Sequence, residues 1–526
     1  MARSHAARAE RDTTVPAGPW GRPSALSAPS VVQWGTRLGA EHRTAVDLVL
    51  IATLATVLAL PSFRWPLDSM DESLLLVYAE QVRSGQVPHR DFFTVYGPAP
   101  FYGLAGLFWT FGSSLVVERI FGLTLHVAVA FGCYAVGRSR DRATGVLAAM
   151  LSLTLMFPLG TVAYAWLGAM ACLVGAVGLA ARGTFTGDVV AGLLAGLCAA
   201  FRPEVAAIAV LALVPYVWRT RRWKGVLGGV LLGLGPLAVF AEVAGQRMWR
   251  NIVLGRMGVN GSLRLADTSL RSAMILTSVL LVTAMLVWLA WRRRTRASAA
   301  YAIVAVGLLP QTLQRVDPEH ALYTLCITVP LLAVAVTPAA PTVTSMHRRR
   351  LLVVSMCIAL MAGLAATVLR APDAVPVRVG ERSVLLSQSD AAGLADTRSV
   401  LLANAPSGGT VFVGSTDMAR VSLSRITTYY LLPELRARGY YLELALGVSE
   451  RAGSGLVDDL RTADVLVLSH MPDGLMGRLY PYIPKGSEEA NEVVRREFCP
   501  VAETSWGVIY VHRSCVDSAS RVKQMS

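Results

Sequence analysis

Three carboxylates follow the first apolar run of the chain within one short polar stretch: Asp71, Glu72 and Asp91. A carboxylate can accept the proton of a hydroxyl group as that oxygen attacks a second substrate. Two later polar corners carry Arg202 and Arg315, and the planar guanidinium group matches the oxygens of a phosphate. These residue types suit proton transfer from a hydroxyl group and the binding of a phosphate.

Two predicted helices must position the carboxylates. Leu75, Ala79 and Val82 recur at helical spacing within residues 72–83, with polar residues on the opposite side, which predicts an amphipathic helix lying on a bilayer surface. Residues 98–111 are apolar and rich in aromatics, which is typical of a second helix at the membrane interface. A carboxylate between such helices would meet a substrate whose tail lies in lipid and whose head lies in water.

The composition indicates a membrane protein. Of 526 residues, 54% are hydrophobic and only 16% are charged, against about 25% charged in soluble proteins. The low charge excludes a disordered protein and argues against an ordinary cytosolic enzyme. The net charge of +14 comes from arginines in short loops, which favours membrane orientation over nucleic-acid binding. Only three of the basic residues are lysine, a bias typical of a GC-rich bacterial genome such as that of an actinobacterium.

The apolar runs predict a polytopic α-helical protein with about eleven transmembrane helices. They cover residues 44–63, 116–136, 143–157, 160–181, 189–201, 204–218, 225–243, 272–291, 297–309, 322–337 and 351–369. Basic loops alternate on the side of the N-terminal arm, so the positive-inside rule predicts a plasma-membrane protein with a cytoplasmic N-terminus.

The predicted organisation has three parts. Residues 1–43 form a disordered basic cytoplasmic arm, residues 44–370 the transmembrane domain with a first outer loop at 64–114, and residues 371–526 an extracytoplasmic domain. In this tail, apolar runs at 410–414, 464–469 and 506–511 predict buried strands, and residues 428–439 and 454–462 are helix-like. Strands alternating with helices predict a small α/β domain.

The cysteines and histidines predict no metal centre. Cys499 and Cys515 lie in the polar tail, and if that tail is outside the cytosol they are candidate disulfide partners. The other cysteines lie in apolar runs, and no Cys/His cluster with zinc-ligand spacing occurs in the sequence.

The first outer loop resembles the GT-C superfamily of integral-membrane glycosyltransferases. The resemblance is carried by the acidic pair, the predicted surface helix, the Gly85-x-x-Pro-x-Arg-Asp-Phe92 stretch and the Gly97-Pro98-x-x-Phe-Tyr102 stretch. It covers residues 44–222 best. This superfamily uses polyprenyl-phosphate sugars and includes protein O-mannosyltransferases and aminoarabinose and arabinosyl transferases. The family's frequent Lys-Pro-Pro stands here as Tyr96-Gly97-Pro98.

The resemblance implies a GT-C-like fold and a glycosyl transfer from a polyprenyl-phosphate sugar to a hydroxyl of an envelope glycan, lipid or protein. Asp71 takes the role of catalytic base, with Glu72 and Asp91 holding the acceptor or the base. Arg315 and His320 form an Arg-x-Asp-x-x-His element that also resembles related members. The donor phosphate is expected at Arg315, His320 and Arg202. A divalent cation is an optional cofactor, because some members use one.

The loop at residues 242–271 carries an excess of arginine on the predicted outer side. Arg247, Arg250 and Arg256 are expected to bind the head group of the anionic donor, or of anionic membrane lipids.

Each of these residues also has a simpler explanation. Acidic residues favour helix N-termini, so Asp71 and Glu72 could cap the following helix. Asp91 and Arg315 each have an oppositely charged neighbour, Arg202 could extend to lipid head groups, and His320 could be structural. Two other functions also remain: a transporter or flippase of lipid-linked sugars, and a non-catalytic subunit of an envelope-assembly complex. Charges at the outer boundary and the lack of repeats favour an enzyme.

Overall fold

The computed structural model describes residues 31–68, 70–218, 220–255, 257, 270–314, 316–337, 373–420, 424–469 and 484–513, with side chains from residue 42 onward. Met1–Asp47 and Leu48–Ser526 form two units, and the packing described below is that of the second.

The apolar runs between residues 44 and 337 all form helices. These are α1 (Val31–Ala59, followed by η1, Leu60–Arg64), α4 (Leu115–Arg138), α5 (Arg142–Met156, then η2, Phe157–Leu159), α6 (Ala165–Ala180), α7 (Phe185–Phe201), α8 (Pro203–Val217), α9 (Trp223–Ala244), α12 (Leu270–Arg293), α13 (Arg296–Gln314) and α14 (Pro318–Val336). The first begins earlier than predicted. The eleventh predicted span, at 351–369, lies outside the described residues.

The helices have the length and surface of membrane spans. Six of the described helices are long and apolar enough to cross a bilayer, and α6, α7 and α8 are shorter apolar helices. Helix α9 leaves Leu231, Leu232 and Val239 more than 60% exposed, and α12 does the same with Leu281. Large apolar side chains in such a contiguous exposed band suit lipid rather than water. The chain is therefore a multi-pass membrane protein.

Helices α7 and α9 approach each other through paired glycines. A Cβ atom on Gly192 would lie 2.1 Å from the carbonyl oxygen of Val226, and one on Gly229 would lie 2.0 Å from that of Val189. Gly196 and Gly233 make the same kind of approach one turn further along. Small residues spaced by four let membrane helices pack at backbone contact.

Gly229→Ala is expected to lower the free energy of unfolding by about 1–3 kcal/mol, because the added methyl group would overlap the backbone of α7 at Val189. The matched control is Gly228→Ala, where a Cβ atom meets open space, so its stability should change by less than about 1 kcal/mol. Denaturant titration in mixed micelles measures both variants. Equal effects of the two substitutions would contradict this close packing.

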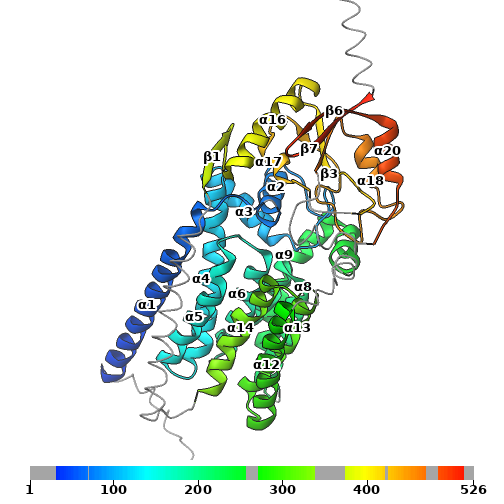
Figure 1. The fold of residues 1–526 in the computed structure, drawn as a ribbon. Coiled ribbons are helices and arrows are strands. Elements are labelled where there is room, and N and C mark those ends of the chain that lie inside the picture. Colours follow the sequence, from blue (N-terminus) through cyan, green and yellow to red (C-terminus); the bar gives the residue numbers. More distant parts are fainter. Residues whose placement is uncertain are drawn as a thin grey trace, which may run out of the picture. The chain divides into compact units, whose positions relative to one another are not determined.

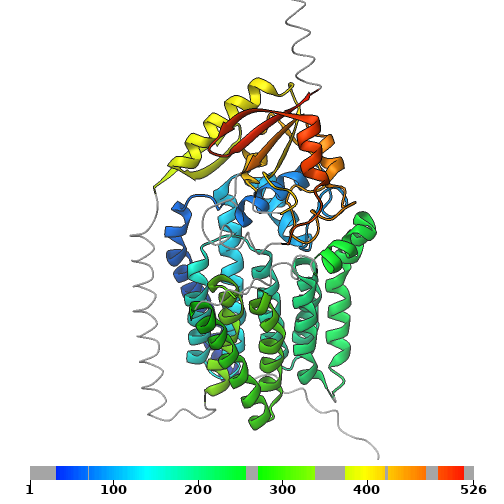
Figure 2. The ribbon, with the colours of Figure 1, turned by 45° about the vertical axis from the view of Figure 1, so that its right-hand side comes forward.

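Helix α2 (Asp71–Arg83) and helix α3 (Ala99–Phe111) lie between the ends of the long helices and the C-terminal elements (Figures 1 and 2). Residues 74–79 of α2 are all buried. The Ser73 hydroxyl is 2.6 Å from that of Thr427, and Arg382 pairs with Glu80 at 3.1 Å, so the C-terminal domain covers the face predicted to lie in water. The predicted helix is present, but its polar side is covered by protein instead of being solvated.

Helix α3 keeps the character expected of an interfacial helix. Its Trp109 and Phe111 are more than 60% exposed, and Tyr102 is also exposed. Aromatic rings with this placement are typical of the boundary between membrane and water.

The C-terminal domain combines a mixed sheet with helices (Figure 1). Its elements are β1 (Ala374–Val379), β2 (Arg382–Ser387), α16 (Gln388–Asn404), β3 (Thr410–Ser415), α17 (Thr427–Leu431), β4 (Arg436–Ala437), α18 (Leu456–Arg461), β5 (Val465–Ser469), α20 (Glu489–Glu497), β6 (Phe498–Thr504) and β7 (Gly507–His512). The sheet order is β4-β3-β5-β7-β6, with β3 parallel to β4 and β5 and with β7 antiparallel to β5 and β6. The antiparallel pair β1–β2 stands apart from it.

The three strands predicted in this domain are confirmed as β3, β5 and β7, and the helix predicted at 454–462 as α18. The helix predicted at 428–439 ends at Leu431 instead, because Pro433 disfavours helical geometry in the residue before it.

Candidate active site

Helix α2 carries both predicted acidic residues in its first turn. The amide of Asp71 donates to Asp68 Oδ2 at 2.9 Å, so the helix begins at Asp71. Acidic side chains here also favour the positive end of the helix dipole. Successive residues of a helix point about 100° apart, so Asp71 and Glu72 face different surroundings.

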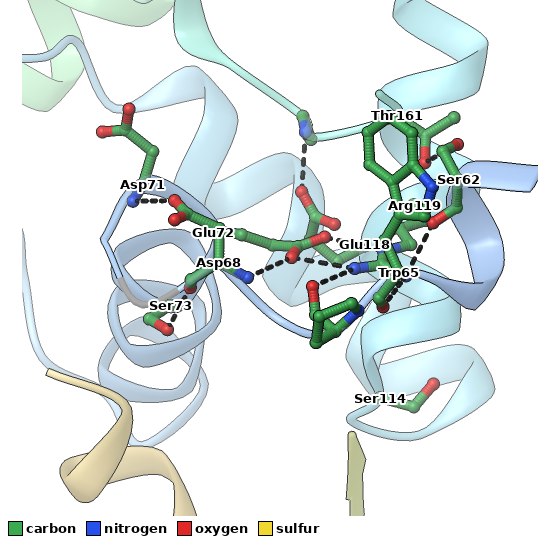
Figure 3. A network of polar contacts seen from close by, with 12 residues as sticks. Ser62, Trp65, Asp68, Asp71, Glu72, Ser73, Ser114, Glu118, Arg119 and Thr161 are labelled. Atoms are coloured by element: carbon green, nitrogen blue, oxygen red, sulfur yellow. Dashed lines mark hydrogen bonds and ion pairs between the residues drawn. The ribbon is translucent and has the colours of Figure 1, made fainter. Parts of the chain in front are cut away.

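Glu72 forms a buried ion pair with Arg119 of α4 (Figure 3). The guanidinium donates to both carboxylate oxygens, at 2.7 and 3.0 Å, and the two side chains are 1% and 4% exposed. Arg119 also donates to the carbonyl oxygens of Ser62 and Trp65, each at 2.9 Å. Glu72 therefore fixes the start of α2 against α4 and η1. The sequence prediction missed Arg119, although two adjacent charges within an apolar run were a visible signal.

A second carboxylate lies in the same buried network. Glu118 Oε1 accepts a hydrogen bond from the amide of Ala163 at 2.6 Å (Figure 3). This contact joins α4 to the short segment that leads into α6.

The Asp71 carboxylate points away from the pair formed by Glu72 and Arg119 (Figure 3). Burial, and then the negative charge of Asp71, raises the pKa of the Tyr96 phenol. The charge of Asp71 also reaches Tyr164 and Tyr323, and these three residues are called the tyrosine wall below.

Aromatic rings from α6 and α14 continue this wall. The Tyr323 ring lies 4.1 Å from that of Trp166 and 5.9 Å from that of Tyr164, measured between centroids. The Tyr323 hydroxyl donates to Glu319. The sequence prediction missed these aromatic residues, because nothing local links α6 to α14.

Arg202 lies at the corner between α7 and α8 and is 5% exposed. Its guanidinium donates to Glu204 at 2.6 Å and to Gln311 at 3.0 Å. Arg202 also lowers the pKa of Tyr96, against the larger effects of burial and Asp71, so Arg202 and Asp71 act on the same phenol.

The Tyr96-Gly97-Pro98 stretch packs on that same corner. The amide of Gly97 donates to the carbonyl of Phe201 at 3.0 Å, and a Cβ atom on Gly97 would lie 2.2 Å from the carbonyl oxygen of Ala200. Only glycine allows so close an approach of the two backbones.

His320 lies near the tyrosine wall but is engaged by Asp317. Asp317 Oδ1 accepts from the amide of His320 at 2.8 Å and lies 2.9 Å from its Nδ1 atom, so Asp317 caps α14. The His320 ring centroid lies 5.3 Å from that of Tyr323. Arg315 lies outside the described residues.

The Asp91 side chain stabilises the loop in which it lies. Its carboxylate accepts from Arg90 at 2.8 and 2.9 Å and from the amide of Val87 at 2.7 Å, and Arg90 is the main cause of its lowered pKa. The hydrogen bonds that the Asp91 carboxylate accepts come from Val87 and Arg90 of the same loop. Its geometry is that of the local ion pair considered above.

Arg247 and Arg250 line a pocket of about 660 Å³ between the segment after α9 and the C-terminal domain. Arg247 belongs to α10 (Gln246–Trp249) and Arg250 begins η3 (Arg250–Gly255). Arg256 lies outside the described residues, as does Cys515, so the pairing of Cys515 with Cys499 stays a prediction. Within the described ranges, no group of three or more His, Cys, Asp or Glu residues is arranged to hold a metal ion.

Glu443 brings a further carboxyl group from the C-terminal domain to α2. The Tyr78 hydroxyl donates to the Phe93 carbonyl at 2.8 Å and lies 3.4 Å from Glu443 Oε2. Burial raises the pKa of Glu443 to about 7, and Glu443 in turn raises that of Tyr96. The sequence prediction missed this residue, which lies in a loop without a motif.

The raised pKa of Glu443 predicts a pH-dependent stability. The folded protein binds this proton more tightly than the unfolded chain, whose carboxyl has its ordinary pKa of 4.5, so stability falls as pH rises between about 4.5 and about 7. Glu443→Gln should remove this component, so its unfolding temperature should fall less than that of the wild type between pH 5 and pH 8. The exposed Glu434→Gln variant is the matched control and should keep the wild-type slope. Parallel slopes in all three proteins would contradict the assignment.

No protein-family model matches the chain, and no curated protein matches it in sequence. Among solved structures, it is similar to ArnT from Cupriavidus metallidurans bound to undecaprenyl phosphate, with a TM-score of 0.57 and 12% identity over 88% of this chain and 97% of that chain. It also matches the arabinofuranosyltransferase AftD from Mycobacteria, with a TM-score of 0.45 and 17% identity over 88% of this chain and 40% of that chain. The first of these similarities extends over nearly the whole of both proteins. The chain therefore shares the overall fold of this ArnT structure.

Proposed function

We propose that this protein is a glycosyltransferase that moves a sugar from a polyprenyl-phosphate donor to a hydroxyl group of a cell-envelope acceptor, at the outer face of the membrane. The fold supports this function, because the ArnT structure that shares it holds undecaprenyl phosphate. The observation that carries the proposal is the placement of Asp71. Its carboxylate lies in the first turn of α2 and is turned away from the buried pair beside it (Figure 3), and its negative charge raises the pKa of the Tyr96 phenol.

The reaction requires one proton acceptor and one stabilised leaving group. The acceptor oxygen forms a bond to the anomeric carbon as its proton passes to Asp71. The bond between that carbon and the phosphate oxygen breaks, and polyprenyl phosphate leaves with the electron pair. Arginine stabilises the growing negative charge on the phosphate.

Other predicted residues support these two tasks. The proposed contacts for the donor phosphate are Arg202, His320 and Arg315. The charges of Arg202 and Asp71 both affect the pKa of Tyr96. Glu72 acts as a positioning residue through Arg119. Asp91 orders the loop that follows α2 through its hydrogen bonds with Val87 and Arg90. Arg256 is proposed to meet the anionic head group of the donor or of a membrane lipid, whereas Arg247 and Arg250 line a pocket for which a different ligand is argued below.

The proposed topology follows the distribution of arginine. About eleven helices within residues 44–370 cross the plasma membrane, residues 1–43 form a cytoplasmic arm, and residues 371–526 form an extracytoplasmic α/β domain. The first outer loop, residues 64–114, and the C-terminal domain then face the same compartment. Their contacts at Thr427 and Arg382 support this arrangement.

The test uses the full chain reconstituted in lipid nanodiscs and a panel of radiolabelled polyprenyl-phosphate sugars. At least one donor is expected to release free polyprenyl phosphate together with a glycosylated hydroxyl acceptor from an envelope extract. Heat-inactivated protein is the control. In proteoliposomes, movement of intact donor between leaflets without release of phosphate would overturn the proposal and indicate a transporter. Folded protein that neither cleaves nor moves any donor would indicate a non-catalytic subunit.

A further inference from the structure

We infer that the pocket of about 660 Å³ beside Arg247 and Arg250 binds an anionic saccharide. This saccharide is part of the acceptor, an assignment that rests on the proposed function. The pocket lies where two parts of the chain meet. Arg247, Arg250 and Asn251 come from α10 and η3, and Tyr440, Tyr441 and Arg451 come from the C-terminal domain. Its volume falls within the range of about 300–1,000 Å³ that is typical of ligand sites.

Hydrogen bonds hold the aromatic side of the pocket in place. Asp459 accepts from the amides of Tyr440 and Tyr441, at 2.8 and 2.7 Å. The Tyr440 hydroxyl accepts from Asn251 Nδ2 at 2.7 Å and donates to the His89 carbonyl at 3.1 Å. Tyr440 thus connects segments that lie far apart in the sequence, and these bonds exist without a bound ligand. A preformed wall loses little conformational entropy on binding.

The lining suits a sugar. The rings of Tyr440 and Tyr441 meet at 81° with their centroids 5.2 Å apart, and together they form an aromatic corner. Sugar rings pack their C–H faces on aromatic rings and direct hydroxyl groups to polar edges. The remaining wall combines the small residues Gly453, Ser454 and Gly455 with the apolar side chains of Leu254 and Val448.

The charge suits an anion. Three arginines line the pocket, and Arg247 stacks on the Tyr440 ring at 5.2 Å. Arg250 and Arg451 are exposed, and neither forms an ion pair with any residue that the structure describes. Of the two aspartates in the lining, Asp459 is already committed to backbone amides.

The pocket is connected to the helix that carries Asp71. The Phe93 ring packs behind the corner, with its centroid 5.4 Å from that of Tyr441 and 6.2 Å from that of Tyr440. The carbonyl of Phe93 accepts from Tyr78 of α2. A saccharide held here would therefore lie on a surface that is hydrogen bonded to α2, which suits an acceptor whose terminal hydroxyl must reach the first turn of that helix.

The test measures binding to the full chain in phosphatidylcholine nanodiscs by equilibrium dialysis. The probe is a short oligosaccharide of uronic acids, and its carboxyl-reduced form is the neutral control of equal length. We expect the charged form to bind at least tenfold more tightly. Arg250→Gln/Arg451→Gln, and separately Arg451→Glu, should weaken its binding at least tenfold, whereas Arg495→Gln, an exposed arginine of the same domain outside the pocket lining, should not.

Several outcomes would overturn the inference. Equal binding of both oligosaccharides would exclude an anion-selective pocket, and unchanged binding by the folded pocket variants would place the saccharide elsewhere. Competition by inorganic phosphate at equal concentration would indicate a phosphate site. Loss of saccharide binding in phosphatidylglycerol nanodiscs would indicate a lipid head-group site.

A further variant separates this inference from the proposed function. Asp71→Asn should bind the charged oligosaccharide as the wild type does. If the wild type binds the oligosaccharide but transfers no sugar, the pocket stands and the proposed function falls. If it transfers sugar but binds no oligosaccharide, the pocket alone falls.

Discussion

Asp71→Asn is expected to lower kcat for glycosyl transfer by about 10²–10⁴-fold, the usual contribution of a positioned general base. The amide keeps the size of the carboxylate but does not take the acceptor proton. Because the Asp71 side chain takes no part in the buried pair of Glu72 and Arg119, the fold should be unaffected (Figure 3). The measurement is the initial rate of polyprenyl phosphate release, with the unfolding temperature recorded on the same samples.

The control for this substitution is Glu434→Gln, which neutralises an exposed carboxylate of the C-terminal domain. It should keep the wild-type rate within about twofold. A rate for Asp71→Asn within threefold of the wild type, in protein with wild-type stability, would remove Asp71 from the proton transfer.

Arg119→Met is expected to lower the free energy of unfolding by about 3–5 kcal/mol, because it leaves the Glu72 carboxylate buried without its partner. The three backbone carbonyls that Arg119 reaches, at Ser62, Trp65 and Pro66, lose a donor as well. Denaturant titration in mixed micelles gives the change.

Removing both charges should restore most of this stability. Glu72→Gln/Arg119→Met leaves no buried charge, so it should be more stable than Arg119→Met alone. The surface pair of Arg90 and Asp91 supplies the contrast, because Arg90→Gln should leave the free energy of unfolding nearly unchanged. A double variant no more stable than the single one would show that the carbonyl contacts, rather than the pairing, dominate.

The local pattern of the chain was enough to predict its long elements. Apolar runs predicted the helices between residues 44 and 337, and short apolar runs predicted β3, β5 and β7. Both signals depend on neighbouring residues alone. The same reasoning was wrong about the surroundings of α2, because its cover at Thr427 is separated from Ser73 by 354 positions.

The candidate site was predictable only in part. The acidic pair and Arg202 stand out in sequence because charges interrupt apolar segments. Sequence spacing did not reveal that Glu72 faces Arg119 or that Tyr164 and Tyr323 meet, since these contacts join separate helices. Nor did it reveal Glu443, whose raised pKa arises from burial under another part of the chain.

The segment that covers α2 is synthesised long after α2 itself, which has a consequence for how the protein folds during translation. A ribosome adding about 5–20 residues per second needs roughly 20–70 s to proceed from Ser73 to Thr427. Throughout that interval the nascent α2 lacks the segment that later contacts it at Ser73. Chains that stop before Thr427 should leave this side of α2 uncovered and should be removed by cellular quality control.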